Sequence, residues 1–198
     1  MANKITAMMS EIFLRNKVQE LIVNVSDFPK DGIQFKDITP VLQDHETMKM
    51  LIDFYSEEFN LLKEKGKVNK IVAIESRGFI FGSLLSLSTG LPMVLARKPG
   101  KLPRETAAYS YDLEYGSNSI ELHVNDISSD DKVIVVDDLL ATGGTISAVC
   151  KLINQLGGDV AFIWNLIELT DLNGKNVIRK NINNTSREIF PIHSLLKI

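Results

Sequence analysis

The chain has 198 residues, of which 44% are hydrophobic and 24% are charged, and its formal net charge at pH 7 is −3. This length suits one globular domain with a substantial core, and the acidic balance argues against broad binding to nucleic-acid phosphates. No run of about 18 apolar residues indicates a membrane span, and no signal-peptide pattern opens the chain, so we expect a cytoplasmic protein without a membrane partner. The single cysteine, Cys150, is expected to be a buried, reduced thiol.

Two helical patterns separated by an irregular stretch occupy the N-terminal third of the chain. Apolar residues at helical spacing predict an amphipathic helix over residues 11–24 and a second helix over residues 46–65. Proline and glycine within residues 27–32 break the first helix, and residues 33–40 are expected to be extended or a loop. The spacing around Phe35 favours a core position, although an aromatic platform for a flat ligand is an alternative.

Strands then alternate with helices, which predicts an α/β fold with a mostly parallel, twisted sheet flanked by helices. The expected strands cover residues 70–75, 91–96, 132–138, 160–169 and part of 188–196, and the expected helices cover residues 79–88 and 145–156. Asn173-Gly174 marks a turn. Residues 97–104 hold four basic residues, two prolines and a glycine, and the long polar segment that they open is typical of a functional loop. The alternation at residues 119–124 is consistent with a lid-like hairpin.

The stretch KVIVVDDLLATGGT, residues 132–145, carries the strongest functional signal. A β-branched run leads to two adjacent carboxylates and then to a turn of small residues that opens a helix. Backbone N–H groups at a helix N-terminus bind anions, and glycine allows a phosphate to approach the backbone closely. The turn is neither a Walker A loop, since no lysine follows its glycines, nor a GxGxxG turn. Its residues are Ala141, Thr142, Gly143, Gly144 and Thr145.

The two acids before this turn, Asp137 and Asp138, suit a different part of the same ligand. They would repel a phosphate, but carboxylates accept hydrogen bonds from sugar hydroxyls. A phosphate on the turn and a diol on the acids together describe a ribose 5-phosphate group. A capped strand-to-helix connection with solvated acids is the simpler alternative, and the whole string favours the ligand site.

Arg77 follows another expected strand, at the turn into the next helix. An arginine in this place either pairs with a carboxylate or binds an anion at the carboxyl end of the strand. The residues alone leave both roles open.

Residues 133–145 resemble the phosphoribosyl pyrophosphate signature of the type I phosphoribosyltransferases. Three further segments resemble the adenine phosphoribosyltransferases within this family. Residues 28–42 resemble their base-binding hood, residues 75–82 their pyrophosphate loop, and residues 97–103 with 113–116 their flexible catalytic loop. The resemblance implies a single phosphoribosyltransferase domain over residues 1–198, with a small hood at about 24–42 and a flexible lid loop at about 97–123.

The reaction that this resemblance implies belongs to purine salvage: adenine and 5-phospho-α-D-ribose 1-diphosphate (phosphoribosyl pyrophosphate) give AMP and pyrophosphate. The expected cofactor is Mg²⁺, held mainly by substrate and water rather than by protein ligands, because it prefers oxygen donors and keeps several waters. Members of the family form homodimers, so a homodimer without a nucleic-acid partner is expected. Two alternatives remain: transfer to a 6-oxopurine, and a non-catalytic regulator that senses purines or phosphoribosyl groups.

The resemblance also implies a role for each matching residue. The turn at residues 141–145 holds the 5′-phosphate, and Asp137 and Asp138 bind the ribose hydroxyls. Pyrophosphate is bound by Ser76, Arg77, Arg97, Lys98, Lys101 and Tyr115. The peptide between Glu75 and Ser76 is often cis in this family.

The remaining implied roles concern the base and the chemical step. Phe35 stacks on adenine, and the backbones of Gln34 and Lys36 read its edge. Arg77 and Glu114 are the catalytic candidates. Glu114 is placed near adenine N7, where it acts as a general base or only orients the base.

Overall fold

The computed structural model describes residues 2–112, 117–182 and 190–198, which divide into two compact units, Met1–Glu57 and Glu58–Ile198. The first unit contains helix α1 (Ala2–Leu21), strands β1 (Val23–Ser26) and β2 (Gln34–Asp37), and the short helix α2 (Thr39–Gln43). Helix α3 (His45–Glu64) begins in the first unit and ends in the second. None of the described helices is long and apolar enough to cross a membrane.

Strands β1 and β2 form an antiparallel hairpin in which Val25 lies opposite Phe35. The connection contains Asp27 in a left-handed conformation, and its carboxylate accepts a hydrogen bond from the Gly32 backbone at 2.8 Å. The helix predicted over residues 11–24 therefore ends earlier than expected, at Leu21. Pairing with β2 places the valines of β1 in a strand, a conformation that β-branched residues favour.

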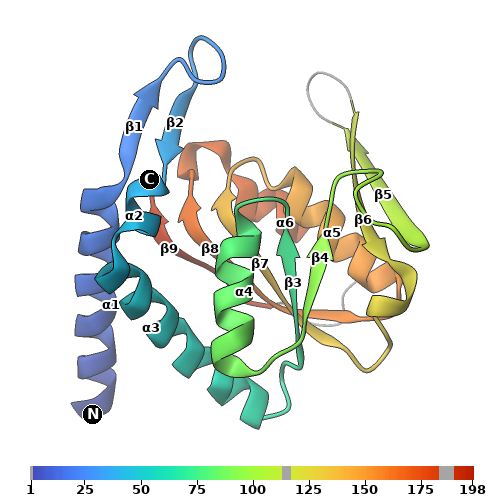
Figure 1. Cartoon of the computed structure of the whole chain (residues 1–198), viewed down its shortest axis with the longest axis horizontal. Coiled ribbons are helices and arrows are strands. Elements are labelled where there is room, and N and C mark those ends of the chain that lie inside the picture. The colour runs from blue at the N-terminus through green and yellow to red at the C-terminus, as the bar shows by residue number, and fades with distance from the viewer. Residues whose placement is uncertain (1, 113–116, 183–189) are drawn as a thin grey trace. The chain divides into compact units, whose positions relative to one another are not determined.

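The second unit is built on one five-stranded parallel sheet with the order β4–β3–β7–β8–β9 (Figure 1). Its strands are β3 (Lys70–Ile74), β4 (Met93–Ala96), β7 (Lys132–Leu140), β8 (Asp159–Glu168) and β9 (Ile192–Lys197). Helices α4 (Gly78–Thr89), α5 (Gly144–Gln155) and α6 (Gly174–Ile182), with the 3₁₀ turns η1 (Val124–Asp126) and η2 (Thr170–Leu172), lie between strands along the chain. The predicted α/β fold with a parallel sheet is confirmed.

Helices cover both faces of this sheet. On one face, Phe81 of α4 packs on Trp164 with ring centroids 5.5 Å apart, and Phe59 of α3 packs on Phe162 at 5.7 Å. Phe162 and Trp164 share a face because side chains alternate along a strand. Closely packed aromatic pairs of this kind fix where α4, and therefore the turn before it, lies on the sheet.

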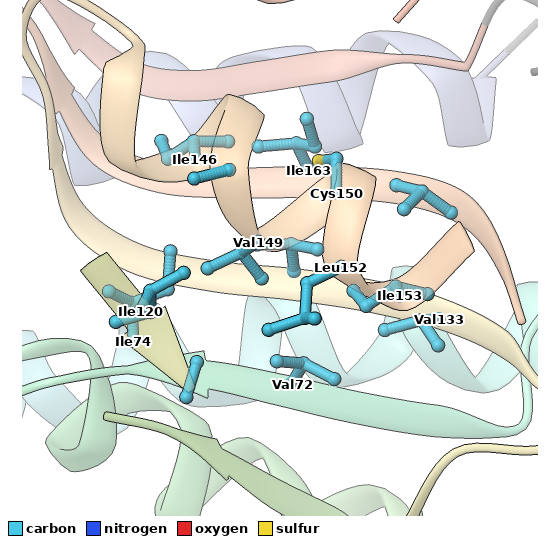
Figure 2. Close-up of a cluster of buried hydrophobic side chains, with 14 of the residues drawn as sticks. Val72, Ile74, Ile120, Val133, Ile146, Val149, Cys150, Leu152, Ile153 and Ile163 are labelled. Carbon is cyan, nitrogen blue, oxygen red and sulfur yellow. The ribbon is translucent and has the colours of Figure 1, made fainter. Parts of the chain in front are cut away.

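The other face is covered by α5. Its apolar side packs on Val133 and Ile163 of the sheet (Figure 2). Cys150 lies within this core, and burial raises the pKa of its thiol, so the prediction of a buried core thiol is confirmed. This packing places the N-terminus of α5 directly after the carboxyl end of β7.

Strands β5 (Thr106–Asp112) and β6 (Ser117–His123) form an antiparallel hairpin within the segment expected to be a lid. Ile120 and Leu122 of this hairpin are buried in the same core as α5. The base of the hairpin is joined to the end of β4 by two backbone hydrogen bonds between Arg97 and Glu121. Closure of the segment over a ligand stays a prediction.

Candidate active site

Most of the predicted site residues of the second unit lie at one edge of the sheet. Strands β4, β3 and β7 are neighbours, and because they are parallel their carboxyl ends meet there. Arg97 follows β4, Ser76 and Arg77 follow β3, and the two acids lie near the end of β7. Carboxyl edges of this kind are the usual ligand sites of open α/β sheets.

Arg77 and Asp138 form an ion pair across this edge, with Arg77 Nε 2.6 Å from Asp138 Oδ2. The Asp138 side chain is only 9% exposed, so the arginine compensates a largely buried charge. Gly78, the first residue of α4, lets this helix begin close to β7, because a Cβ there would lie 2.8 Å from the Val136 carbonyl oxygen. Of the two roles that the sequence left open for Arg77, the structure shows the pairing with a carboxylate, and binding of an anion stays a prediction.

Asp137 has a different environment from its neighbour. Burial of its carboxyl group, followed by the negative charge of Asp138, raises the pKa of Asp137 well above its usual value. The backbone N–H of Asp138 donates a hydrogen bond to this carboxyl at 2.9 Å. A carboxyl with a raised pKa retains its proton more readily, so the acid pair repels a nearby phosphate less than two full charges would.

Glu75 is a site residue that the sequence analysis did not select. Its carboxylate accepts hydrogen bonds from Arg97 Nε at 3.2 Å and from the Lys98 backbone at 3.0 Å. Burial alone would raise the pKa of Glu75, but these hydrogen bonds and the charge of Arg97 bring it below its usual value. The peptide from Glu75 to Ser76 is cis, as the family resemblance implied. The sequence signal that could have identified Glu75 was its place at the end of β3, beside Ser76 and Arg77.

The basic segment after β4 is thereby anchored at its first residue. Arg97 binds Glu75, donates from Nη1 to the Lys101 carbonyl at 3.0 Å, and lies over the Phe79 ring. Lys98 and Lys101 are exposed. The structure thus brings Arg97 to the sheet edge and leaves the two lysines in solvent.

The small-residue turn at residues 141–145 leads from β7 into α5. Gly143 caps the helix with φ of 80°, in the left-handed region that glycine adopts without strain. Thr142 is exposed and Gly143 is buried. A cavity of about 490 Å³ adjoins the turn, lined by Thr142, Gly144, Tyr111 and other residues of α5, α6 and β5.

Tyr111 of β5 is a second residue that the sequence analysis did not place in the site. Its hydroxyl lies 2.9 Å from Thr145 Oγ1, and its ring packs beside Gly144. The hairpin therefore contacts the predicted phosphate turn directly. The only sequence signal for this contact was that Tyr109 and Tyr111, two positions apart, lie on the same side of a strand.

The predicted adenine residues Gln34, Phe35 and Lys36 lie in β2, in the first unit. Phe35 is partly exposed and packs edge to face on Phe28 with centroids 5.1 Å apart, so the core position that its spacing favoured is wrong. The Lys36 ammonium donates to Asn24 Oδ1 at 2.6 Å. The Phe35 ring therefore packs within the hairpin and remains partly exposed.

Two predicted residues, Glu114 and Tyr115, lie outside the described residues. In the part of the chain that the structure describes, no group of three or more His, Cys, Asp or Glu side chains is arranged to hold a metal ion.

Residues 41–185 match the family of the phosphoribosyl transferase domain, almost three quarters of the chain. The chain belongs to the phosphoribosyltransferase family. This phosphoribosyltransferase is 46% identical to the adenine phosphoribosyltransferase of Escherichia coli O157:H7 over 182 residues, which cover 91% of this chain and 95% of that relative.

Solved structures agree with this assignment. The adenine phosphoribosyltransferase of Thermoanaerobacter pseudethanolicus superposes with a TM-score of 0.79 at 43% identity, covering 93% of this chain and 99% of that one. The enzyme of Saccharomyces cerevisiae, complexed with D-2,5-dideoxy-2,5-imino-altritol 1,6-bisphosphate and adenine, gives 0.80 at 33% identity with the same coverage. The prediction of an adenine phosphoribosyltransferase is confirmed.

Proposed function

We propose that this protein transfers the 5-phosphoribosyl group of phosphoribosyl pyrophosphate to adenine, giving AMP and pyrophosphate. The observation that carries the proposal is the arrangement at one sheet edge of a glycine turn, an acid pair and Arg77, in a chain of this family. Adenine is preferred as the acceptor because the similar enzyme of Saccharomyces cerevisiae was captured with adenine.

The sugar phosphate is held by one continuous segment, residues 137–145. Backbone N–H groups of the turn at the N-terminus of α5 donate to the 5′-phosphate. Asp137 and Asp138 accept hydrogen bonds from the ribose hydroxyls. Both ends of the ribose 5-phosphate group are thereby fixed, which leaves C1 as the reactive centre.

The leaving group is met by positive charge. The bond between ribose C1 and the pyrophosphate oxygen breaks as adenine N9 bonds to C1, and the ring gains oxocarbenium character on the way. Ser76, Arg77, Arg97, Lys98, Lys101 and Tyr115 bind the departing pyrophosphate. Cations aimed at developing negative charge are a large source of transition-state stabilisation. Closure of the lid at about residues 97–123 excludes water that would otherwise hydrolyse the sugar.

Mg²⁺ is the proposed cofactor, and it would be held mainly by oxygens of the substrate and by waters, because it prefers oxygen ligands and usually keeps several waters. The carboxyl groups of Asp137 and Asp138 stay assigned to the ribose hydroxyls. When bound, Mg²⁺ offsets part of the negative charge of the diphosphate. Chelation of the metal should therefore abolish turnover, which restored Mg²⁺ recovers.

Two sets of residues are proposed to act on the base. Phe35 stacks on adenine, and the backbones of Gln34 and Lys36 recognise its amino edge. Glu114 accepts the N7 proton as N9 attacks, a general-base role worth roughly 10²–10⁴-fold. A Glu114→Gln variant should lower kcat more than it weakens binding of phosphoribosyl pyrophosphate. Equal kinetics in variant and wild type would remove this assignment.

The decisive test is a steady-state assay with Mg²⁺ and phosphoribosyl pyrophosphate across adenine, hypoxanthine and guanine. We expect pyrophosphate release with adenine and strong discrimination against the 6-oxopurines, whose carbonyl cannot replace the amino donor. Preference for hypoxanthine or guanine would reassign the substrate. Binding of purines without any turnover would instead indicate a regulator.

A homodimer in the cytoplasm is the expected state of the enzyme. Ile80, Leu84 and Leu87 are exposed on one face of α4, and Leu87 is 83% exposed. Side chains spaced by four and three residues lie on the same side of a helix, and an apolar stripe of this kind suits contact with a second copy. Light scattering should detect a dimer that Leu87→Glu weakens and that Leu61→Glu, at another exposed apolar site, leaves intact.

A further inference from the structure

The first turn of α6 packs against the outside of the turn at residues 141–145. The contact joins backbone to backbone: a Cβ on Gly174 would lie 2.2 Å from the Ala141 carbonyl oxygen and 3.1 Å from the Gly143 nitrogen. It is also reciprocal, because a Cβ on Gly143 would lie 2.5 Å from the Gly174 carbonyl oxygen. Two glycines 31 positions apart in the sequence therefore permit one close approach.

The segment before Gly174 is fixed to the ends of β7 and β8. The backbone of Leu169 donates to the Leu140 carbonyl at 2.9 Å, and Asn173, in a left-handed conformation, donates to the Thr170 carbonyl at 3.0 Å. Leu140 and Glu168 are register partners in β7 and β8. Both sides of the contact are therefore attached to the same two strands.

An ion pair holds the start of α6 in place. Lys175 Nζ lies 2.7 Å from Glu168 Oε2, and the two side chains are only 20% and 9% exposed. Glu168 ends β8, so this pair ties the residue next to Gly174 to the sheet. A pair so well covered is screened less by salt than a surface pair, and its geometry restrains the helix start.

We propose that Gly174 and the Lys175–Glu168 ion pair form a support that sets the shape of the 5′-phosphate turn, so that Gly174 and Lys175 are positioning residues for phosphoribosyl pyrophosphate. This inference rests on the proposed function, which assigns the 5′-phosphate to that turn. The turn binds through backbone N–H groups, whose directions depend on the backbone angles of residues 141–145. Since Gly143 has no side chain, the contact with Gly174 supplies the restraint from outside.

Gly174→Ala is the primary test. We expect KM for phosphoribosyl pyrophosphate to rise about 10–10²-fold with KM for adenine little changed, because small displacements of a positioning group have effects of this size. Isothermal titration should show the same loss for AMP, which carries the 5′-phosphate, and none for adenine, which lacks it. The matched control is Gly158→Ala, whose Cβ would lie 2.7 Å from Ile127 Cγ2 at the other end of α5. It should lower Tm without changing AMP binding.

Lys175→Met and Glu168→Gln test the ion pair without a steric clash. Each should raise KM for phosphoribosyl pyrophosphate roughly 3- to 10-fold, and the double variant should be no worse than the more affected single variant, because the partners act as a unit. Lys175→Arg, which keeps the charge, should recover most of the affinity.

The outcomes separate the inference from the function on which it rests. If Gly174→Ala does not fold, the AMP affinity of Lys175→Met tests the inference instead. Unchanged AMP affinity in every variant that folds would overturn the support while leaving the proposed function intact. A wild-type protein that binds neither AMP nor phosphoribosyl pyrophosphate would overturn both.

Discussion

The two halves of the proposed sugar-phosphate site are held in opposite ways. The turn at residues 141–145 is neutral, and its shape comes from backbone packing against Gly174 and from the contact of Thr145 with Tyr111. The strand ends beside it are highly charged, and their charges are paired with one another as Arg77 with Asp138 and Arg97 with Glu75. One half is set by sterics and the other by electrostatics.

This difference suggests how each half responds to a ligand. A turn fixed by backbone contacts presents its N–H groups without reorganisation, which favours binding of the 5′-phosphate. The ion pairs hold Arg77 and Arg97 at the sheet edge, and in the proposed reaction the incoming diphosphate would compete with Asp138 and Glu75 for them. Substitutions on the charged side should therefore change both turnover and stability, whereas those on the turn should chiefly change binding.

The largest effect is expected from Arg77→Gln. It removes a cation from the leaving group, so kcat/KM should fall roughly 10²–10³-fold. It also leaves the buried Asp138 carboxylate without this partner, so Tm should fall in the same variant. Arg15→Gln, which opens an exposed pair with Glu11, is the control and should change neither quantity. A variant with normal kcat/KM would show that the charged strand ends do not contribute to turnover as we expect.

Asp137→Asn should separate function from stability. The folded state raises the pKa of Asp137, so ionisation of this group destabilises the fold progressively above the pKa of the unfolded chain and until the folded pKa is passed. At neutral pH the neutral variant should therefore have a higher Tm than wild type. Loss of the carboxyl group as an acceptor for a ribose hydroxyl should weaken phosphoribosyl pyrophosphate binding about 10- to 10²-fold. Thermal scans and steady-state kinetics should be measured on the same variant. A variant in which Tm and the affinity for phosphoribosyl pyrophosphate both fall would contradict this expectation.

Tyr111→Phe tests the neutral side. It removes one hydrogen bond to Thr145, worth about 0.5–1.5 kcal/mol, so KM for phosphoribosyl pyrophosphate should rise about two- to tenfold with kcat nearly unchanged. Tyr109→Phe is the matched control in the same strand, because its ring packs on the core and lies beneath Lys151. A fall in kcat without a change in KM would show that this contact acts on the chemical step.

The smallest expected effect concerns Glu75→Gln. Because the folded state lowers the pKa of Glu75, its contribution to stability is fully present above the unfolded pKa and is lost as pH falls through the folded pKa. At neutral pH the free energy of unfolding of the variant should be lower than that of wild type by about 1 kcal/mol or less, and this difference should vanish in acid. A difference that persists at the lowest pH would assign the loss to packing instead.

Local patterns predicted much of this protein and failed at identifiable places. The buried strands and α5 were predicted because their apolar residues recur at strand or helix spacing over many residues. Helix α6 was missed because it has nine residues and only two large buried apolar side chains, Ile178 and Ile182. Strand β1 was read as the end of a helix because its pairing partner, β2, lies across a loop.

The candidate site divides in the same way. The acid pair and the glycine turn were identifiable because all their residues fall within residues 132–145, where one strand passes into one helix. Glu75 and Tyr111 were not selected, because each is defined by a partner more than 20 positions away, Arg97 and Thr145 respectively. No local pattern encodes such a contact.

The sequence by itself thus determined the α/β class, the glycine turn with the acid pair before it, and the membership of the phosphoribosyltransferase family, since each depends on residues close together in the chain. Only the tertiary structure decided which charges are paired, that the hairpin touches the turn, and that Gly174 lies against Gly143. Those features depend on how helices and strands pack, and packing joins residues that chain order keeps apart. For this reason the candidate ligand-binding groups could be named from the sequence, whereas the contacts that hold them in position could not.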